Sequence, residues 1–486
     1  MPGDDPNCPN PVYPLTTSGD WIVSYADPNC KVRLAGVTWY GFQSTNFVPA
    51  GLDFATYQNI LQTVANLGFN SVRIPLSDEL VKYNGKIVIN AKKWLKAEPK
   101  SFLNANKVLH PLTLLDDIVQ QARQDNLMII LDNHFSKARN ADDVANHVVL
   151  TRRSSAASAD ARRAGGVDDG CTSTTGCPLW YGAGYSQAQW IADWRSLANR
   201  YSSYPNVIGF DLRNEPHTNW EGGSWSLRTY LTGGATWGPC SKALCGKLAS
   251  LWNPTTNWPA AATTAGNDIL AINPHLLMFV EGTQLYPELH TKHGVEPYWW
   301  GSILKGVAAD PIHFDVPNQL VYSPHEWGPW KCCGDETQKE FGPKTTDASL
   351  DQVFNANWGY ILNSSNPAVQ APIWLGEFNT CNAPQKKTRA GKIATPDACV
   401  EGAKPGSEGQ WFQALVAYMK ANPEISWSYY PLNATNVLNQ VSNNSVLGCP
   451  WGTTAKKCKS KHASGWDEPR VPALMTYLRQ IESPGN

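Results

Sequence analysis

Eight short apolar segments that alternate with longer amphipathic stretches constrain the fold of this chain most. The expected strands are Val32–Thr38, Ser71–Pro75, Met128–His134, Val207–Arg213, Leu276–Glu281, Leu320–His325, Ile373–Glu377 and Ile425–Tyr430. Several are nearly continuous apolar runs, as expected of parallel strands that are covered on both faces. Helical patterns between them include Phe54–Leu67, Leu112–Asp125, Trp190–Tyr201 and Gln410–Ala421. This alternation predicts an α/β fold, a (β/α)8 TIM barrel. A doubly wound open sheet is the alternative, but no Gly-rich phosphate-binding loop follows the first strand.

The length of 486 residues fits one barrel with loop insertions. We therefore predict a single domain over residues 1–486, without an internal repeat or a Ser/Thr/Pro-rich linker. Residues 1–31 are expected to cap the floor of the barrel, with a β-hairpin in which Trp21–Ala26 pairs with Lys31–Leu34. Residues 136–178 form a polar loop insertion after the third strand, which either edges a substrate groove or is a passive surface loop.

The net charge of −1 provides no basic field for nucleic acid and no strong field for a charged substrate, whereas a neutral polymer is compatible with it. No run of eighteen apolar residues is present, so no membrane span is expected. The first five residues are polar rather than a signal peptide. We expect the gene to encode a secretion signal upstream of this sequence, and hence a secreted, extracellular protein.

Twelve cysteines lie almost wholly in polar segments rich in Gly and Pro, which favours disulfides and an oxidising compartment. A zinc site is disfavoured because no pair of C-x-x-C units exists. Short separations suggest the pairs Cys171–Cys177, Cys240–Cys245 and Cys449–Cys458. Acceptor patterns for N-glycosylation occur at Asn363, Asn433 and Asn443. The expected product is a disulfide-bonded glycoprotein.

Two of the expected strands deliver a glutamate to their carboxyl ends. Glu215 follows the fourth strand, within the string Asp-Leu-Arg-Asn-Glu-Pro-His, and Glu377 ends the seventh strand. In a closed barrel the carboxyl ends of the strands meet at one face, so we expect these carboxylates to share a cavity. Two carboxylates that flank a glycosidic bond can hydrolyse it, one as general acid and then base, the other as nucleophile.

The two glutamates need opposite protonation states for that chemistry. Glu215 must hold its proton at the working pH, and the nearby charge of Glu377 favours this. Glu377 must be ionised to attack the sugar. The alternative for Glu215 is an exposed carboxylate held by a neighbouring Arg.

The strings around these glutamates resemble those of glycoside hydrolase family 5 (clan A), especially secreted endo-β-1,4-glucanases (cellulases). The resemblance extends from Leu34–Phe42 to Trp427–Tyr430. It implies retaining hydrolysis of internal β-1,4-glucosidic bonds in cellulose or a related β-glucan, by double displacement and with no cofactor or metal. It leaves open a mannanase, xyloglucanase or mixed-linkage β-glucanase of the same family. A catalytically inactive carbohydrate-binding protein is the non-enzyme alternative. We expect a monomer.

The resemblance also implies roles for polar residues near the strand ends. Arg73 would hold Glu377 in position, although an ion pair with another acid such as Asp132 is an alternative. Asn214 would hydrogen-bond the sugar 2-hydroxyl, with a turn-capping Asn as the alternative. His134 and His325 would lie at the floor of the sugar site.

Two positions depart from the pattern of the family. Many members have His-x-Tyr on the sixth strand, where this chain has His325-Glu326-Trp327, and a Trp on the eighth strand, where it has Tyr430. We hypothesise that Trp327 donates to the nucleophile through its indole N–H, and that Tyr430 forms the platform under the sugar.

The chain is rich in aromatic rings, with 21 Trp and 18 Tyr, and this favours a groove in which flat rings stack on sugars. Trp300, which follows the fifth strand, resembles a substrate platform of related glucanases. Weaker candidates, each of which could equally pack in the core, are Trp39, Trp180, Tyr181 and Trp220. His217 is expected to be structural or to lie at the edge of the groove.

Overall fold

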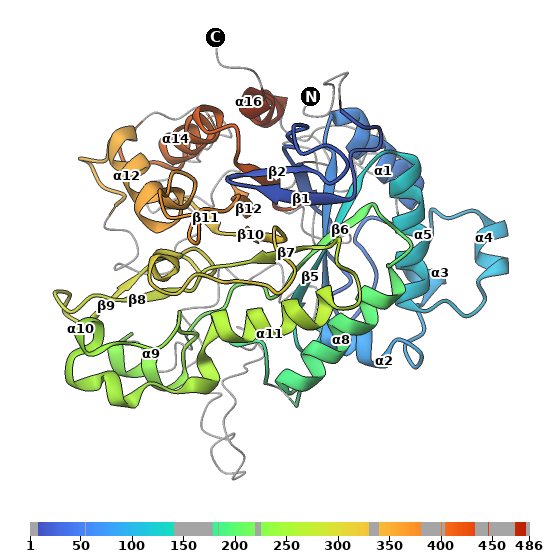
Figure 1. Ribbon diagram of the computed structural model, residues 1–486. Coiled ribbons are helices and arrows are strands. Elements are labelled where there is room, and N and C mark those ends of the chain that lie inside the picture. Colours follow the sequence, from blue (N-terminus) through green and yellow to red (C-terminus); the bar gives the residue numbers. More distant parts are fainter. Residues whose placement is uncertain are drawn as a thin grey trace, which may run out of the picture.

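A curled parallel sheet surrounded by helices forms the centre of the protein (Figure 1). The computed structural model describes residues 8–53, 55–139, 178–182, 184–218, 225–329, 340–380, 400, 404–432, 446 and 472–482. The strands of the central sheet are β3 (Ala35–Thr38), β4 (Ser71–Ser77), β5 (Met128–Phe135), β6 (Val207–Asp211), β7 (Leu277–Val280), β10 (Leu320–Tyr322), β11 (His325–Trp327), β12 (Trp374–Asn379) and β13 (Ser426–Tyr429). Within the described residues they are ordered β10-β7-β6-β5-β4-β3-β13-β12-β11, and neighbouring strands pair in parallel.

The predicted sixth strand is split into β10 and β11, and the split is where the barrel closes. β10 pairs with β7, whereas β11 pairs with β12, and Tyr322 bridges Ile373 just before β12. Ser323 and Pro324 separate the two halves, and Pro324 has no N–H to donate to a ladder. Its carbonyl still accepts from the N–H of Gly376. The prediction of a (β/α)8 barrel is confirmed.

Helices cover the outer face of the sheet. The helices of three turns or more are α1 (Tyr57–Leu67), α5 (Pro111–Gln124), α8 (Gln187–Arg200), α11 (Trp258–Leu270), α12 (Asp347–Asn357), α14 (Glu408–Ala421) and α16 (Pro472–Glu482). Shorter helices are α2 (Asp78–Tyr83), α3 (Ala91–Trp94), α4 (Lys100–Ala105), α9 (Leu227–Gly233) and α10 (Lys242–Cys245). Short 3-10 helices are η2 (Gly246–Leu251), η3 (Pro254–Thr256), η4 (Lys305–Ala308) and η6 (Gly359–Ile361).

Side-chain caps set where several of these helices begin. Thr56, Ser186 and Ser407 each accept a hydrogen bond from a backbone N–H in the first turn of α1, α8 and α14. The predicted helix over Phe54–Leu67 therefore begins at Tyr57, because Thr56 is its cap. Neighbouring helices also pack on one another, as α8 and α11 do along the outside of β6 and β7 (Figure 1).

The N-terminal hairpin differs from the one that we predicted. β1 (Leu15–Ser18) pairs with β2 (Trp21–Ser24), and the expected pairing with Lys31–Leu34 is reduced to a single bridge between Val23 and Lys31. The two-residue turn between β1 and β2 contains Gly19 at φ +60°, a conformation that glycine adopts without steric cost. The chain after Lys31 instead runs straight into β3. The predicted pairing is therefore confirmed only in part, at this antiparallel bridge, and the main partner of β2 is β1.

The hairpin caps the floor of the barrel, as predicted. Leu15 and Ile22 are fully buried against side chains from the amino-terminal ends of the barrel strands, including Met128, Ile208 and Leu277. A disulfide between Cys8 and Cys30 ties the start of the described chain to this layer. The cap therefore closes the end of the barrel opposite the carboxyl ends of the strands.

The second disulfide of the described residues, Cys240–Cys245, confirms one of the three predicted pairs. The pairs Cys171–Cys177 and Cys449–Cys458 lie outside the described residues, as do Asn433, Asn443 and most of the 136–178 insertion. Asn363 is described and exposed, in the turn after η6. None of the helices in the described part of the chain is both long and apolar enough to cross a bilayer. A second small sheet pairs β8 (Leu285–Pro287) with β9 (Val295–Pro297).

We expect Leu15→Ala to lower the free energy of unfolding by about 2–5 kcal/mol, because it leaves a cavity between the cap and the barrel floor. The matched control is Leu289→Ala, since that leucine is 47% exposed and its change should stay within about 0.5 kcal/mol. Urea denaturation of both variants measures the difference. Equal losses for the two variants would show that the cap does not dock on the floor.

Candidate active site

A buried arginine lies at the centre of the site. Arg73, on β4, contacts the carboxylates of Asp211 at 2.9 Å, Asp132 at 3.2 Å, Glu281 at 3.4 Å and Glu377. Burial alone would lower the pKa of Arg73, but these carboxylates raise it well above its ordinary value. Both partners that the sequence offered for Arg73, Glu377 and Asp132, therefore contact it together. An unpaired charge at this depth would be very costly.

The two glutamates from distant parts of the sequence meet beside His325. His325 on β11 is in register with Glu377 on β12. Its Nδ1 lies 3.0 Å from Oε1 of Glu215 and 4.0 Å from Oε2 of Glu377. One oxygen of Glu215, one oxygen of Glu377 and a ring nitrogen of His325 all lie within 4.8 Å of one another. The expectation that both carboxylates face one cavity at the carboxyl ends of the strands agrees with this geometry.

Glu215 sits on an unusual backbone just after β6. Its φ of 51° lies in the left-handed region, which is uncommon for a residue other than glycine. Its N–H donates to Oε2 of Glu281 over 2.6 Å. The preceding residue, Asn214, accepts a hydrogen bond from Arg73 through Oδ1 at 3.0 Å. The side chains of Arg73 and Glu281 therefore hold the turn that carries Asn214 and Glu215 at the centre of the site.

His134 and His217 are both buried and neutral. Nδ1 of His134 donates to Oδ2 of Asp132 over 2.6 Å, and burial lowers the pKa of His134 to about 3. Burial also lowers the pKa of His217 to about 4. Nδ1 of His217 donates to the backbone carbonyl of Glu215 over 2.6 Å. His217 therefore supports the turn that carries Glu215.

Trp300 stacks on the ring of His217. The ring centroids are 3.8 Å apart and the planes are inclined by 1°. Trp300 itself is half-buried. The stack fixes the indole ring within contact of the Glu215 turn.

Trp327 and Tyr430 lie beside one another. Their rings form a T-shaped pair with centroids 6.2 Å apart. Trp327 is two residues beyond His325 on β11, opposite Asn379, and is 4% exposed. The roles of donor and platform that we assigned to this pair stay predictions.

Two of the weaker aromatic candidates are buried in the core. Trp39 and Trp180 are fully buried, and their indole N–H groups donate to the carbonyl of Ala50 and to Gln187. Tyr181 is half-buried and donates to Thr255. Trp220 lies outside the described residues. Trp39 and Trp180 therefore pack in the core.

Asp211 and Glu281 belong to the site, although the sequence analysis did not select them. Each is an acidic residue at the carboxyl end of an apolar strand, the same signal that identified Glu377. Burial raises the pKa of Asp211 to about 6 and that of Glu281 well above its ordinary value. An acid at the end of an apolar strand is thus a signal that could have found both residues.

Two groups of side chains have the donor atoms that a metal ion needs. They are Asp211, Glu281 and His325, and Glu215, His325 and Glu377. Arg73 already supplies positive charge to the carboxylates of Asp211, Glu281 and Glu377. A cation would have to compete with that guanidinium for the same oxygens.

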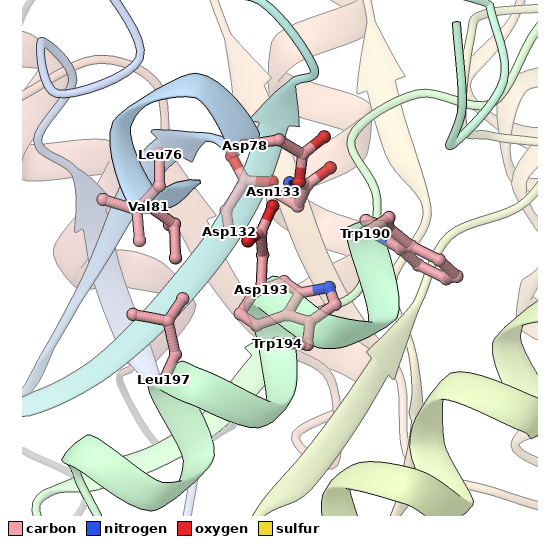
Figure 2. Close-up of a pocket in the computed structure, with 9 residues that line it drawn as sticks. All are labelled: Leu76, Asp78, Val81, Asp132, Asn133, Trp190, Asp193, Trp194 and Leu197. Atoms are coloured by element: carbon pink, nitrogen blue, oxygen red, sulfur yellow. Dashed lines mark hydrogen bonds between the residues drawn. The ribbon is translucent and has the colours of Figure 1, made fainter. Parts of the chain in front are cut away.

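A small acidic cavity lies behind the site, between β4, β5 and α8 (Figure 2). Its volume of about 10 Å³ is close to the space that one water molecule needs. The lining residues are Leu76, Asp78, Val81, Asp132, Asn133, Trp190, Asp193, Trp194 and Leu197. One carboxylate oxygen each of Asp78, Asp132 and Asp193 has no hydrogen-bond partner among the described residues. Burial raises the pKa of Asp78 and of Asp193 to about 7. Asp132 links this cavity to Arg73.

The chain matches a family and a set of relatives that agree with this geometry. The family model described as cellulase (glycosyl hydrolase family 5) matches residues 30–436. An endoglucanase of Paenibacillus polymyxa is 30% identical over 96% of this chain and 87% of its own length. The major extracellular endoglucanase of Xanthomonas campestris pv. campestris is 26% identical over 83% of this chain and 63% of its own length. The structure of an endocellulase from Pyrococcus horikoshii in complex with cellotetraose is 25% identical, covers 98% of this chain and all of that one, and has a TM-score of 0.65.

The barrel and these matches define the class of the protein as a glycoside hydrolase. Because the family model covers most of the chain, the protein belongs to glycosyl hydrolase family 5.

Glu326, a fully buried residue of β11, should make the stability of the protein depend on pH. Tyr298 and Trp358 donate to its carboxyl over 2.6 Å and 3.1 Å, and burial raises its pKa to about 8. In the unfolded chain the pKa of a glutamate is about 4.3. The folded state therefore favours the protonated form, and this stabilisation is fully present below about pH 4 and is lost as the pH rises towards 8. We expect the free energy of unfolding to fall between pH 5 and pH 8.

Glu326→Gln should make that fall smaller, because the amide does not ionise. Urea denaturation of both proteins at a fixed ionic strength measures the two slopes. Identical slopes would mean that Glu326 does not titrate in this range.

Proposed function

We propose that the protein is a retaining endo-β-1,4-glucanase that acts on cellulose or a related β-glucan. The observation that carries the proposal is the approach of Glu215 to Glu377, because one carboxyl oxygen of each lies within 4.8 Å of the other. Carboxyl groups about 5–5.5 Å apart are typical of retaining enzymes, whereas inverting enzymes need about 6.5–9.5 Å to admit a water molecule. The relatives named as endoglucanases, and the cellotetraose bound by the Pyrococcus horikoshii endocellulase, support the β-1,4-glucan substrate.

The reaction proceeds in two displacements. Glu215 gives its proton to the glycosidic oxygen while a carboxylate oxygen of Glu377 bonds to the anomeric carbon, and the leaving sugar departs as an alcohol. Glu215 then takes a proton from water, whose oxygen displaces Glu377 and restores the starting state. Arg73 contacts a carboxylate oxygen of Glu377 directly and so holds that carboxyl in place. The steps need no cofactor or metal.

The neighbouring polar groups have roles that fit their contacts. Oδ1 of Asn214 accepts from Arg73, which leaves the amide N–H groups of Asn214 to donate to the sugar 2-hydroxyl. Nδ1 of His134 donates to Asp132, so Nε2 is the acceptor side of that ring. His134 and His325 would form the floor of the site.

The aromatic residues complete the proposed sugar site. Trp300, fixed by its stack on His217, would form one platform for the substrate. Tyr430 would form another, beside Trp327, whose indole N–H would donate to Glu377.

We also propose that residues 1–486 act as one catalytic domain, as a secreted monomer. The Cys8–Cys30 and Cys240–Cys245 disulfides and the extracellular relative support secretion. Size-exclusion chromatography with light scattering tests the monomer.

We expect Glu377→Gln and Glu215→Gln each to lower kcat on the order of 10³-fold or more, while the thermal unfolding midpoint stays near that of the parent. Each change removes an ionisable carboxyl and keeps its shape. Hydrolysis of cellotetraose followed by proton NMR should show the β-anomer forming first. Initial formation of the α-anomer, or near-normal turnover of either variant, would contradict the assignment.

Among soluble polysaccharides, we expect carboxymethylcellulose to be cleaved faster than mannan, xyloglucan or mixed-linkage β-glucan. Reducing-sugar release gives the rates, and a viscosity that falls much faster than reducing ends appear indicates internal cleavage. Faster release from mannan or xyloglucan would point to the alternative activities. Binding without any product would point to a carbohydrate-binding protein.

A further inference from the structure

Glu281 makes contacts that connect the two sides of the proposed active site. It directly follows β7, is fully buried, and its carboxylate reaches three different groups. Oε2 accepts from the N–H of Glu215 over 2.6 Å. Oε1 lies 3.1 Å from Nε2 of His325 and 3.4 Å from Nη2 of Arg73. The other nitrogen of His325 reaches the carboxyl of Glu215.

We propose that Glu281 is a positioning residue for Glu215, holding its backbone directly and, through His325, fixing which carboxyl oxygen carries the proton that is transferred. The inference rests on the proposed role of Glu215 as acid and base. It adds that the protonated oxygen is Oε2, because His325 donates to Oε1.

The backbone of Glu215 has an unusual conformation that Glu281 helps to hold. Its φ of 51° is disfavoured for a residue with a side chain, and the hydrogen bond from its N–H to Glu281 helps to hold it. Glu281 is itself anchored, because its carbonyl accepts from the indole of Trp258 over 2.8 Å. Gly301, at φ +75°, packs so closely that a Cβ there would collide with Oε2 of Glu281. These contacts leave the carboxylate of Glu281 little freedom.

Glu281 and His325 form a buried pair that shares a proton, with Oε1 of Glu281 3.1 Å from Nε2 of His325. Burial raises the pKa of Glu281, and although burial alone would lower the pKa of His325, the carboxylates of Glu281 and Glu377 raise it well above its ordinary value. The pair therefore retains a proton at neutral pH. Whether that proton stays on Nε2 of His325 or moves to Glu281, Nδ1 still carries a hydrogen and donates to Oε1 of Glu215. Oε2 of Glu215 is then the oxygen that carries the proton for the leaving group.

Leaving-group dependence separates a defect in the acid from a defect in the nucleophile. A dinitrophenyl β-cellobioside has a leaving group that departs without protonation, whereas a phenyl β-cellobioside needs the acid. General acid catalysis typically contributes about 10²–10⁴-fold. For Glu281→Gln we expect kcat/KM to fall at least about tenfold more on the phenyl substrate than on the dinitrophenyl substrate. A glutamine at this position cannot accept from Glu215 and also satisfy both His325 and Arg73, because its nitrogen only donates.

Asp211→Asn is the matched control. Asp211 is an equally buried strand-end acid that contacts Arg73. Its carboxylate also lies within 4.8 Å of the nearest atoms of Glu281 and His325, but Asp211→Asn keeps both the hydrogen bond from the N–H of Glu215 to Glu281 and the contact of His325 with the Glu215 carboxyl. Its loss should act through Arg73 and Glu377, and should therefore lower the rate on both substrates by similar factors. Thermal unfolding of each variant checks that the fold is kept.

Equal losses on the two substrates for Glu281→Gln would overturn the inference. Glu215→Gln must itself show the larger loss on the phenyl substrate, and if it does not, the acid/base assignment fails instead. If Glu281→Gln does not fold, Glu281→Asp takes its place, because the shorter side chain keeps the charge and withdraws the carboxylate from the N–H of Glu215. The same leaving-group dependence in Glu281→Asp supports the inference, and its absence overturns it.

Discussion

The buried charge of Arg73 is the constraint around which the site is built. A guanidinium with no solvent contact needs anionic partners, and Asp132, Asp211, Glu281 and Glu377 come from different strands of the barrel to supply them. The same contacts fix Glu377 for attack in the proposed mechanism. Removing any one of these acids would therefore alter both the charge balance of the core and the position of the nucleophile.

The interruption of the sixth strand places the histidine of the site. Because Pro324 breaks the ladder between β10 and β11, the chain resumes at His325 in register with Glu377. His325 then lies between Glu215, Glu281 and Glu377. A continuous strand would keep pairing with β7, whereas the interrupted one pairs with β12 after Pro324. The step that closes the barrel thus also positions the histidine between the carboxylates.

Acidic groups continue behind the site into the protein. Asp132 contacts Arg73 and His134 and also lines the cavity that contains Asp78 and Asp193 (Figure 2). Burial raises the pKa of each of these acids towards neutrality. The protonation state of the carboxyl groups that line the cavity is therefore connected, through the contact of Asp132 with Arg73, to the groups that hold the proposed nucleophile. The stability of the protein and the electrostatics of its active site share the same buried carboxyl groups.

The sequence by itself determined the barrel, its eight strand segments and the residues Arg73, Glu215 and Glu377, because apolar periodicity and a polar residue at a strand end are local signals. It left open whether Arg73 pairs with Glu377 or Asp132, and it missed Asp211 and Glu281. It also found only part of the pairing in the N-terminal hairpin, where the main partner of β2 is β1. These outcomes depend on distances between residues that are far apart in the chain. Only the closed barrel decides them, because packing around one buried cation determines which acids can reach it.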